Sequence, residues 1–222
     1  MNAGKPILAI IGGTGALGSG LAHRFAGAGY AVIIGSRISE KAQEMARSLA
    51  GPDGGAQPRG ASNAEAAKAG DIVIVTVPWS SQAEILDAIR PHLGGKLVVD
   101  TTVPLLPPKV SRVQLPPEDS AAVATQKRLG PGARVVAAFH NVAAHKLKSG
   151  GVIDCDILVF GDEPKDRETV IGLAKAAGLR GLHAGPLANS TAAEALTSVL
   201  IGINRTYKVD GAGIRITGIL EG

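Results

Sequence analysis

The feature that most constrains this chain is a glycine-rich turn near its start, which joins an apolar run to a helical pattern. Residues 7–11 are apolar, and the turn that follows reads Gly12-Gly13-Thr14-Gly15-Ala16-Leu17-Gly18. In the spacing Gly13-x-Gly15-x-x-Gly18, the first glycine permits a tight turn and the second lets the backbone approach a pyrophosphate. The third lets the helix pack close to the strand. Because a helix N-terminus offers free N–H groups and a positive dipole end to an anion, residues 13–18 predict a dinucleotide site. The alternative is a purely structural glycine turn.

The end of the second predicted strand indicates which dinucleotide binds. The apolar residues 31–34 lead into Gly35-Ser36-Arg37, and Lys41 lies about one helical turn further on. A site for NAD usually has an acidic residue at this point, which holds the ribose 2′-OH. A hydroxyl beside a guanidinium, with its fork of donors and permanent charge, suits a 2′-phosphate instead. The sequence therefore predicts NADP(H), unless Ser36 only caps the next helix and Arg37 is a solvated surface charge.

Strands and helices alternate along the rest of the chain, which predicts an α/β protein with a Rossmann-type, doubly wound parallel sheet. Further strands are expected over residues 71–77, 96–100, 134–139, 156–161 and 179–183, and helices over 39–50, 63–69, 80–90, 120–129, 163–177 and 189–207. Residues 51–55 and 107–117 are expected to be loops, and residues 212–218 a final extended segment. We expect an NADP-binding domain over residues 1–140 and a small C-terminal α/β cap over residues 141–222.

Charge and composition argue against several classes of function. The formal charge is +4, but the basic residues are dispersed and only 3% of residues are aromatic, so base stacking on nucleic acid is not expected. No apolar run approaches the roughly 20 residues of a membrane span, and no signal peptide fits before the first strand. The single cysteine, Cys155, suits a reducing compartment, so a cytoplasmic protein is expected. The histidines show no metal-ligand spacing, and no metal is predicted.

Several residues are site candidates by position alone. In an open α/β sheet, ligands bind in the crevice outside the carboxyl ends of the strands. Pro78 and Trp79 follow one predicted strand, residues 101–104 follow the next, and His140 follows the strand after that. We therefore expect these three segments to converge on one crevice.

A set of motifs in a fixed order carries a family resemblance. Besides the glycine turn and Gly35-Ser36-Arg37, the chain contains Val77-Pro78-Trp79, Phe139-His140-Asn141-Val142-Ala143-Ala144 and Ala184-Gly185-Pro186-Leu187-Ala188-Asn189-Ser190, followed by a tail from Asn204 to Arg215. Together they resemble the NADPH-dependent coenzyme F420 reductases, also called F420H2:NADP oxidoreductases, over essentially the whole chain. Residues 107–119 and 191–195 match this pattern only loosely. The resemblance implies a cytoplasmic homodimer that transfers a hydride between NADP(H) and the 8-hydroxy-5-deazaflavin coenzyme F420, a small-molecule co-substrate.

The resemblance also implies where the two rings lie. Because a hydride passes directly between nicotinamide C4 and deazaflavin C5, the site mainly has to stack the rings and exclude water. Val77, Pro78 and Trp79 would border the nicotinamide, and Val103 and Pro104 the second ring. The C-terminal domain would contribute to the deazaflavin pocket and to the dimer.

Four polar residues have a functional and a structural interpretation. His140 would hydrogen-bond the pyrimidine edge of the deazaflavin, or it is a strand-end histidine that the backbone satisfies. Thr14 would contact the cofactor and act in catalysis, or it only caps the first helix. Asn189 and Ser190 would close the pocket, although Asn-Ser before a helix is also an ordinary cap signature.

Two other functions stay open from the sequence. One is an NADPH-dependent reductase of another acceptor, such as a flavin, a ferric chelate or an imine. The other is a non-catalytic protein that senses NADP. The chain has no Ser-x-x-x-Lys or Tyr-x-x-x-Lys pair, which counts against the reduction of a ketone.

Overall fold

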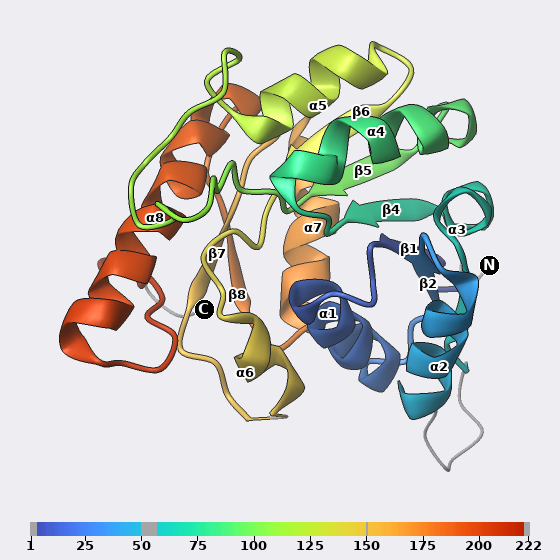
Figure 1. The fold of residues 1–222 in the computed structure, drawn as a ribbon, viewed down its shortest axis with the longest axis horizontal. Helices are drawn as coiled ribbons and strands as arrows, with labels where there is room; N and C mark the ends of the chain where they lie inside the picture. Colours follow the sequence, from blue (N-terminus) through green and yellow to red (C-terminus); the bar gives the residue numbers. More distant parts are fainter. Residues whose placement is uncertain (1–3, 50–56, 150, 220–222) are drawn as a thin grey trace.

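Six parallel strands form the main sheet, in the order β3-β2-β1-β4-β5-β6 (Figure 1). The computed structural model describes residues 4–49, 57–149 and 151–219. The strands are β1 Leu8–Ile11, β2 Val32–Ser36, β3 Arg59–Ser62, β4 Ile72–Val75, β5 Leu97–Asp100 and β6 Arg134–Ala137. The strand order reverses between β1 and β4, which is the switch point where such sheets bind ligands. The predicted doubly wound parallel sheet is confirmed.

Alternating side chains of the buried strands build a core on each face of the sheet. Leu8 and Ile10 of β1 pack in one core with α1 (Ala16–Gly27), α2 (Ser39–Leu49) and α7 (Pro164–Ala176). Ala9 and Ile11 pack in the other core with α3 (Asn63–Ala69), α4 (Trp79–Ile89) and α5 (Ala121–Leu129). Burial on both faces explains why these strands are apolar throughout rather than alternating.

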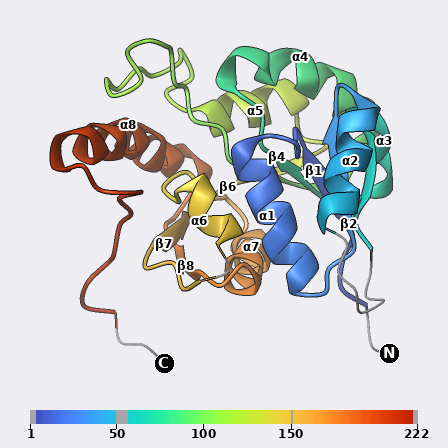
Figure 2. The ribbon, with the colours of Figure 1, turned by 60° about the horizontal axis from the view of Figure 1, so that its bottom comes forward.

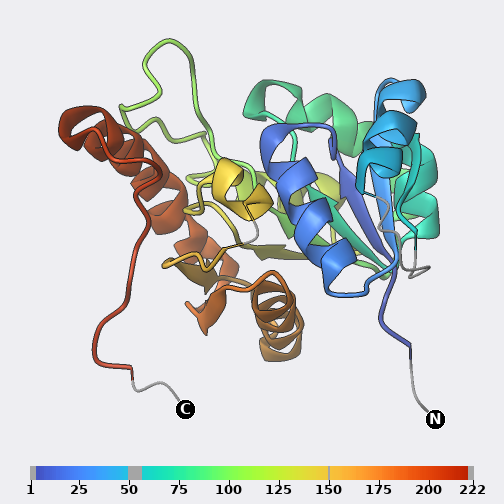
Figure 3. The ribbon, with the colours of Figure 1, turned by 90° about the horizontal axis from the view of Figure 1, so that it is seen from below.

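The C-terminal part is built around a second, two-stranded parallel sheet. It pairs β7 (Asp156–Val159) with β8 (Arg180–His183), and an antiparallel bridge between Ala137 and Phe160 joins it to the end of β6. The remaining helices are α6 (Ala144–Lys148) and α8 (Ser190–Tyr207), with short 3-10 turns at Arg90–His92 and Leu187–Asn189. Figure 2 and Figure 3 show α8 to one side of the main sheet, beside the loop of residues 105–119.

Most predicted elements are present, with ends that shift by one or two residues. The structure adds two elements that the sequence did not predict, β3 and α6. Residues 212–218 form no strand, although the β7 residue Asp156 bonds to the carbonyl of Ile214 and the N–H of Ile216. The loop predicted over residues 51–55 lies outside the described residues. No helix within the described ranges is long and apolar enough to cross a membrane.

Candidate active site

A cleft of about 640 Å³ opens where the carboxyl ends of β1, β2, β4 and β5 meet. Its walls come from the glycine turn, the end of β2, the start of α3, the turn from β4 to α4 and the segment after β5. Of the residues predicted from the sequence, those that line it are Thr14, Gly15, Ala16, Leu17, Ser36, Arg37, Lys41, Val77, Pro78, Trp79, Thr101, Thr102 and Val103. The fold thus brings the glycine turn, the basic strand end and the apolar segments into one cavity.

The glycines of the turn have different physical tasks. The positive φ of 74° belongs to Gly12, one residue before the predicted motif starts. Gly13 and Gly18 are needed for packing, because a Cβ would lie 2.8 Å from the Ile10 carbonyl oxygen and 2.5 Å from the Thr76 hydroxyl, respectively. Neither of these two lines the cleft. A Cβ on Gly15 would meet only the Gly12 carbonyl oxygen, at 3.3 Å, so the open side of Gly15 is the cleft.

Helix α1 begins at this turn without a side-chain cap. Gly15 is the N-cap residue, and no side chain in the described residues accepts a hydrogen bond from the N–H groups of the first turn. Thr14 is therefore not the cap of this helix, and the purely structural alternative for Thr14 is wrong. The N–H groups at the start of α1 remain suited to an anion in the cleft, where the helix dipole also favours negative charge.

The end of β2 presents two cations and a hydroxyl. Ser36 is buried, and its Oγ accepts the N–H of Ile38 at 3.2 Å, so its hydroxyl proton stays available to donate. Arg37 and Lys41 are exposed side chains, and neither forms an ion pair within the described residues. A guanidinium, an ammonium and a hydroxyl at one end of a cleft suit a phosphate group.

The opposite end of the cleft is mostly apolar. Val77, Trp79 and Ile85 come from the β4–α4 side, whereas Val103 and Leu105 come from the segment after β5. Such walls suit a flat ring held by stacking rather than by many hydrogen bonds. Pro104, predicted beside Val103, is buried and does not line the cleft.

A buried carboxyl group supports this apolar end. The Asp100 side chain accepts hydrogen bonds from the Thr102 N–H at 2.8 Å, the Gln82 amide at 2.8 Å and the Thr125 hydroxyl at 2.5 Å. Burial raises the pKa of Asp100, and the three donors lower it. Since Gln82 lies on α4 and Thr125 on α5, the group ties both helices to the strand end that carries Val103.

His140 follows the carboxyl end of β6 and is not one of the residues that line the cleft. It is 6% exposed, and its Nε2 atom has no hydrogen-bond partner within the described residues. Burial lowers the pKa of His140 to about 4, so the ring is neutral near pH 7. A buried imidazole nitrogen without a partner costs about 1–3 kcal/mol. The alternative interpretation, a strand-end histidine whose ring is satisfied by the backbone, therefore does not hold for Nε2.

Asn189 and Ser190 also lie outside the cleft. Asn189 is exposed at the start of α8, whereas Ser190 is buried with its hydroxyl 2.6 Å from that of Ser120. Both serine hydroxyls bond to Glu194, whose other oxygen accepts the Ala121 N–H at 2.7 Å. The contacts of Ser190 assign it to a polar link between α8 and α5.

Sequence reasoning missed several residues of the site. Asn63, Thr76, Ser80 and Ser81 line the cleft. The two serines follow Trp79 directly, so their position was a usable signal. The sequence contains no such signal for Asn63. The strand before it, β3, was not predicted, so nothing indicated that Asn63 follows the carboxyl end of a strand. Within the described residues, no group of three or more His, Cys, Asp or Glu side chains could hold a metal ion.

Comparison with known proteins places the chain in one family. Residues 7–104 match the family model for coenzyme F420-dependent NADP oxidoreductase. The F420-dependent NADP reductase of Methanocaldococcus jannaschii is 40% identical over 221 residues, which cover 96% of this chain and 98% of the relative. The reductase of the same name from Methanothermobacter thermautotrophicus is 40% identical over 223 residues, 96% of each chain.

A solved structure supports the fold. The crystal structure of a protein from Arthrobacter sp. FB24, named as a candidate F420-dependent NADP reductase, matches with a TM-score of 0.81 and 24% identity. The match covers 96% of this chain and all of that one. The resemblance inferred from the motifs is thereby confirmed, and the chain belongs to the family of F420-dependent NADP reductases.

Proposed function

We propose that this protein transfers a hydride between NADP(H) and coenzyme F420. Relatives that are 40% identical over 96% of the chain are named for this activity. The structural observation that carries the proposal is the layout of one cleft: cations at the end of β2, an uncapped helix N-terminus in the middle and apolar walls at the far end. This layout matches, in that order, the 2′-phosphate, the pyrophosphate and the nicotinamide ring of NADP(H).

The proposed NADP site uses the polar half of the cleft. The pyrophosphate would lie against Gly15 and the N–H groups of residues 16–18, because no side chain occupies that position. Ser36, Arg37 and Lys41 would hold the 2′-phosphate. Gly13 and Gly18 would contribute through the turn that they allow rather than by contact.

The proposed hydride transfer uses the apolar half. Bound NADPH supplies a hydride at nicotinamide C4, and F420 accepts it at C5 of its deazaflavin ring. Val77, Pro78 and Trp79 would hold one ring and Val103, backed by Pro104, the other. Their task is to orient the rings and to exclude water, which is most of what a direct hydride transfer needs from a protein.

We assign catalytic roles to Thr14 and His140 within the same proposal. The Thr14 hydroxyl caps no helix and lies in the cleft wall. The neutral His140 ring has a free Nε2 that could hydrogen-bond the deazaflavin's pyrimidine edge. Because His140 lies outside the lining residues, this contact requires the wall after β5 or β6 to move when the acceptor binds.

The proposal extends to assembly and location. Val199, Ile203 and Tyr207 are exposed at helical spacing on α8, and Leu106, Val113 and Leu115 are exposed on the neighbouring loop. An apolar surface of this kind is typical of a protein–protein interface, so we infer a homodimer formed through α8. Residues 1–140 would bind NADP, and residues 141–222 would form the cap that shapes the deazaflavin pocket and the dimer. A cytoplasmic location fits the single cysteine.

The test is a direct assay of the reaction. The purified protein is mixed with NADPH and F420, and the loss of the deazaflavin's visible absorbance is followed. NADH in place of NADPH and FMN in place of F420 serve as controls. Rapid bleaching with NADPH alone is expected. Tight NADPH binding without bleaching would overturn the choice of acceptor and leave the nucleotide site standing.

A further inference from the structure

Asn63 lines the cleft, and the proposed NADP site does not yet assign it a contact. It is the first residue of α3 and follows directly after β3. The β2–β3 register pairs Ser36 with Ser62, so Asn63 lies beside the strand end that continues into Arg37. Asn63, Ser36 and Arg37 all line the same cavity.

The orientation of the Asn63 amide follows from one hydrogen bond. The N–H of Gly12 donates to Asn63 Oδ1 at 3.3 Å. Since a backbone N–H can only donate, the oxygen of the amide must face the glycine turn. The same oxygen would lie 2.8 Å from a Cβ on Gly35, so the side chain is wedged between the turn and β2.

The amide nitrogen is left for a ligand. Within the described residues, Nδ2 of Asn63 makes no hydrogen bond, and the residue is only half-buried. Capping of α3 does not need it, because Ser62 and Glu65 form a reciprocal capping box. The two N–H groups of Asn63 are therefore donors at the border between the glycine turn and the basic strand end.

We propose that Asn63 determines cofactor specificity by donating a hydrogen bond from Nδ2 to the 2′-phosphate of NADP(H). This inference rests on the proposed function, in which the pyrophosphate lies at the glycine turn and the 2′-phosphate at Ser36 and Arg37. The adenosine ribose must then pass between them, beside Asn63. A donor-only NH2 group complements phosphate oxygens, whereas a carboxylate at this position would repel them and would accept from a free 2′-OH.

The test exchanges the amide nitrogen for an oxygen. Asn63→Asp keeps Oδ1 for the Gly12 N–H and replaces the two donors with a negatively charged acceptor. Calorimetry compares adenosine 2′,5′-bisphosphate, which has the 2′-phosphate, with AMP, which lacks it. We expect the Kd of the bisphosphate to rise about 10- to 100-fold, the cost of a lost charge-assisted hydrogen bond, and that of AMP to change less than about threefold.

Asn204→Asp is the matched control. The Oδ1 of Asn204 also accepts a backbone N–H, that of Ala212 at 2.7 Å, and Asn204 is not a lining residue of the cleft. The control adds the same charge elsewhere, so both Kd values should stay unchanged. Thermal unfolding verifies that each variant is folded. If Asn63→Asp unfolds early, Asn63→Ser removes the whole amide, including the Oδ1 that accepts the Gly12 N–H, without adding charge. It should weaken the bisphosphate about two- to tenfold more than AMP.

The outcomes separate this inference from the proposed function. Equal weakening of both ligands would show that Asn63 only supports the glycine turn, and no change in either would show that it does not face the phosphate. Each result overturns the specificity role. A wild-type protein that binds AMP as well as the bisphosphate would instead overturn the proposed NADP site itself.

Discussion

Arg37 and Lys41 present positive charge to the cleft with no carboxylate paired to either within the described residues. A cation without an internal partner costs little to keep in water and stays available to a ligand phosphate. If Arg37 binds the 2′-phosphate, Arg37→Asp should raise the Kd of NADPH about 100-fold and leave that of NADH within about threefold, because only NADPH loses a charge-assisted bond. Titration of the cofactor's fluorescence measures both constants.

Arg47→Asp is the control for this prediction. Arg47 is an exposed residue in the last turn of α2, the helix that also carries Lys41, and it does not line the cleft. The same change in charge there should leave the preference for NADPH intact. An unchanged preference in Arg37→Asp would refute the assignment of the phosphate site.

The contact between α8 and α5 depends on a buried carboxyl group. Glu194 of α8 is 1% exposed and accepts hydrogen bonds from the Ala121 and Ala122 N–H groups at the start of α5. Burial raises the pKa of Glu194 to about 7, and the negative charge of Asp100 also raises it, whereas the hydrogen-bond donors lower it. Desolvation outweighs the donors, so the folded protein favours the protonated form at mildly acidic pH.

This pKa predicts how the free energy of unfolding changes with pH. A carboxyl group whose pKa is raised on folding contributes stability below its ordinary pKa of 4.5, and that contribution is lost as the pH rises through about 7. Glu194→Gln removes this titration and retains an oxygen for the Ala121 N–H. The stability of the wild type relative to the variant should therefore fall by about 3 kcal/mol between pH 4.5 and pH 7.5.

Urea unfolding of both proteins across this range provides the measurement. Comparing the two proteins matters because His140, with its lowered pKa, gives both of them the opposite slope: neutral His140 stabilises above pH 6.5, and this is lost as the pH falls. A difference that stays constant with pH would contradict the burial of Glu194 as a protonated acid.

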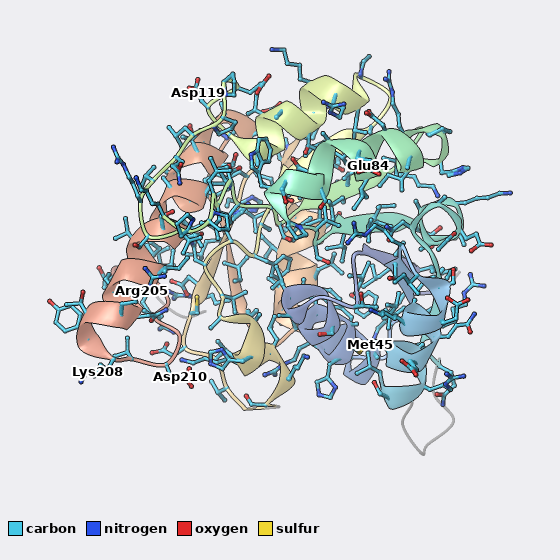
Figure 4. The ribbon with its side chains drawn as sticks, viewed as in Figure 1. Met45, Glu84, Asp119, Arg205, Lys208 and Asp210 are labelled. Carbon is cyan, nitrogen blue, oxygen red and sulfur yellow. The ribbon has the colours of Figure 1, made fainter. Side chains whose placement is uncertain are left out.

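At the scale of the whole molecule, several exposed apolar side chains of the described residues lie on α8 and on the loop of residues 105–119. Ile203 lies in the middle of the exposed stripe on α8, and Arg205 and Lys208, labelled in Figure 4, mark the carboxyl end of that helix. If α8 forms the dimer interface, light scattering should give the wild type about twice its chain mass of 22.4 kDa. Ile203→Glu should give the mass of one chain, because it places a charge in an apolar contact.

Lys175→Glu, on an exposed position of α7, is the control and should remain a dimer. A wild-type protein with the mass of one chain would contradict the proposed assembly. A dimeric Ile203→Glu variant would place the interface on another surface.

The sequence by itself determined the strands and helices other than β3 and α6, and the residues of the glycine turn and the end of β2 that line one half of the cleft. Both follow from local patterns: apolar runs for strands buried on two faces, helical spacing between them, and a glycine turn in which Gly13 and Gly18 leave no room for a Cβ. Ser36 and Arg37 were found because the end of β2 must lie at the carboxyl edge of such a sheet.

Only the tertiary structure decided the features that depend on contacts between distant segments. The β3 sequence Arg59-Gly60-Ala61-Ser62 has no strand pattern, and it is a strand because it pairs with β2 beneath α2, where a Cβ on Gly60 would lie 2.2 Å from the backbone of Ala42. That pairing brings Asn63 into the cleft. Glu194 meets α5 across more than 70 residues of sequence, and His140 is enclosed on folding. Local periodicity carries no information on these long-range contacts, because the burial and the charge environment of a side chain depend on which surfaces pack together.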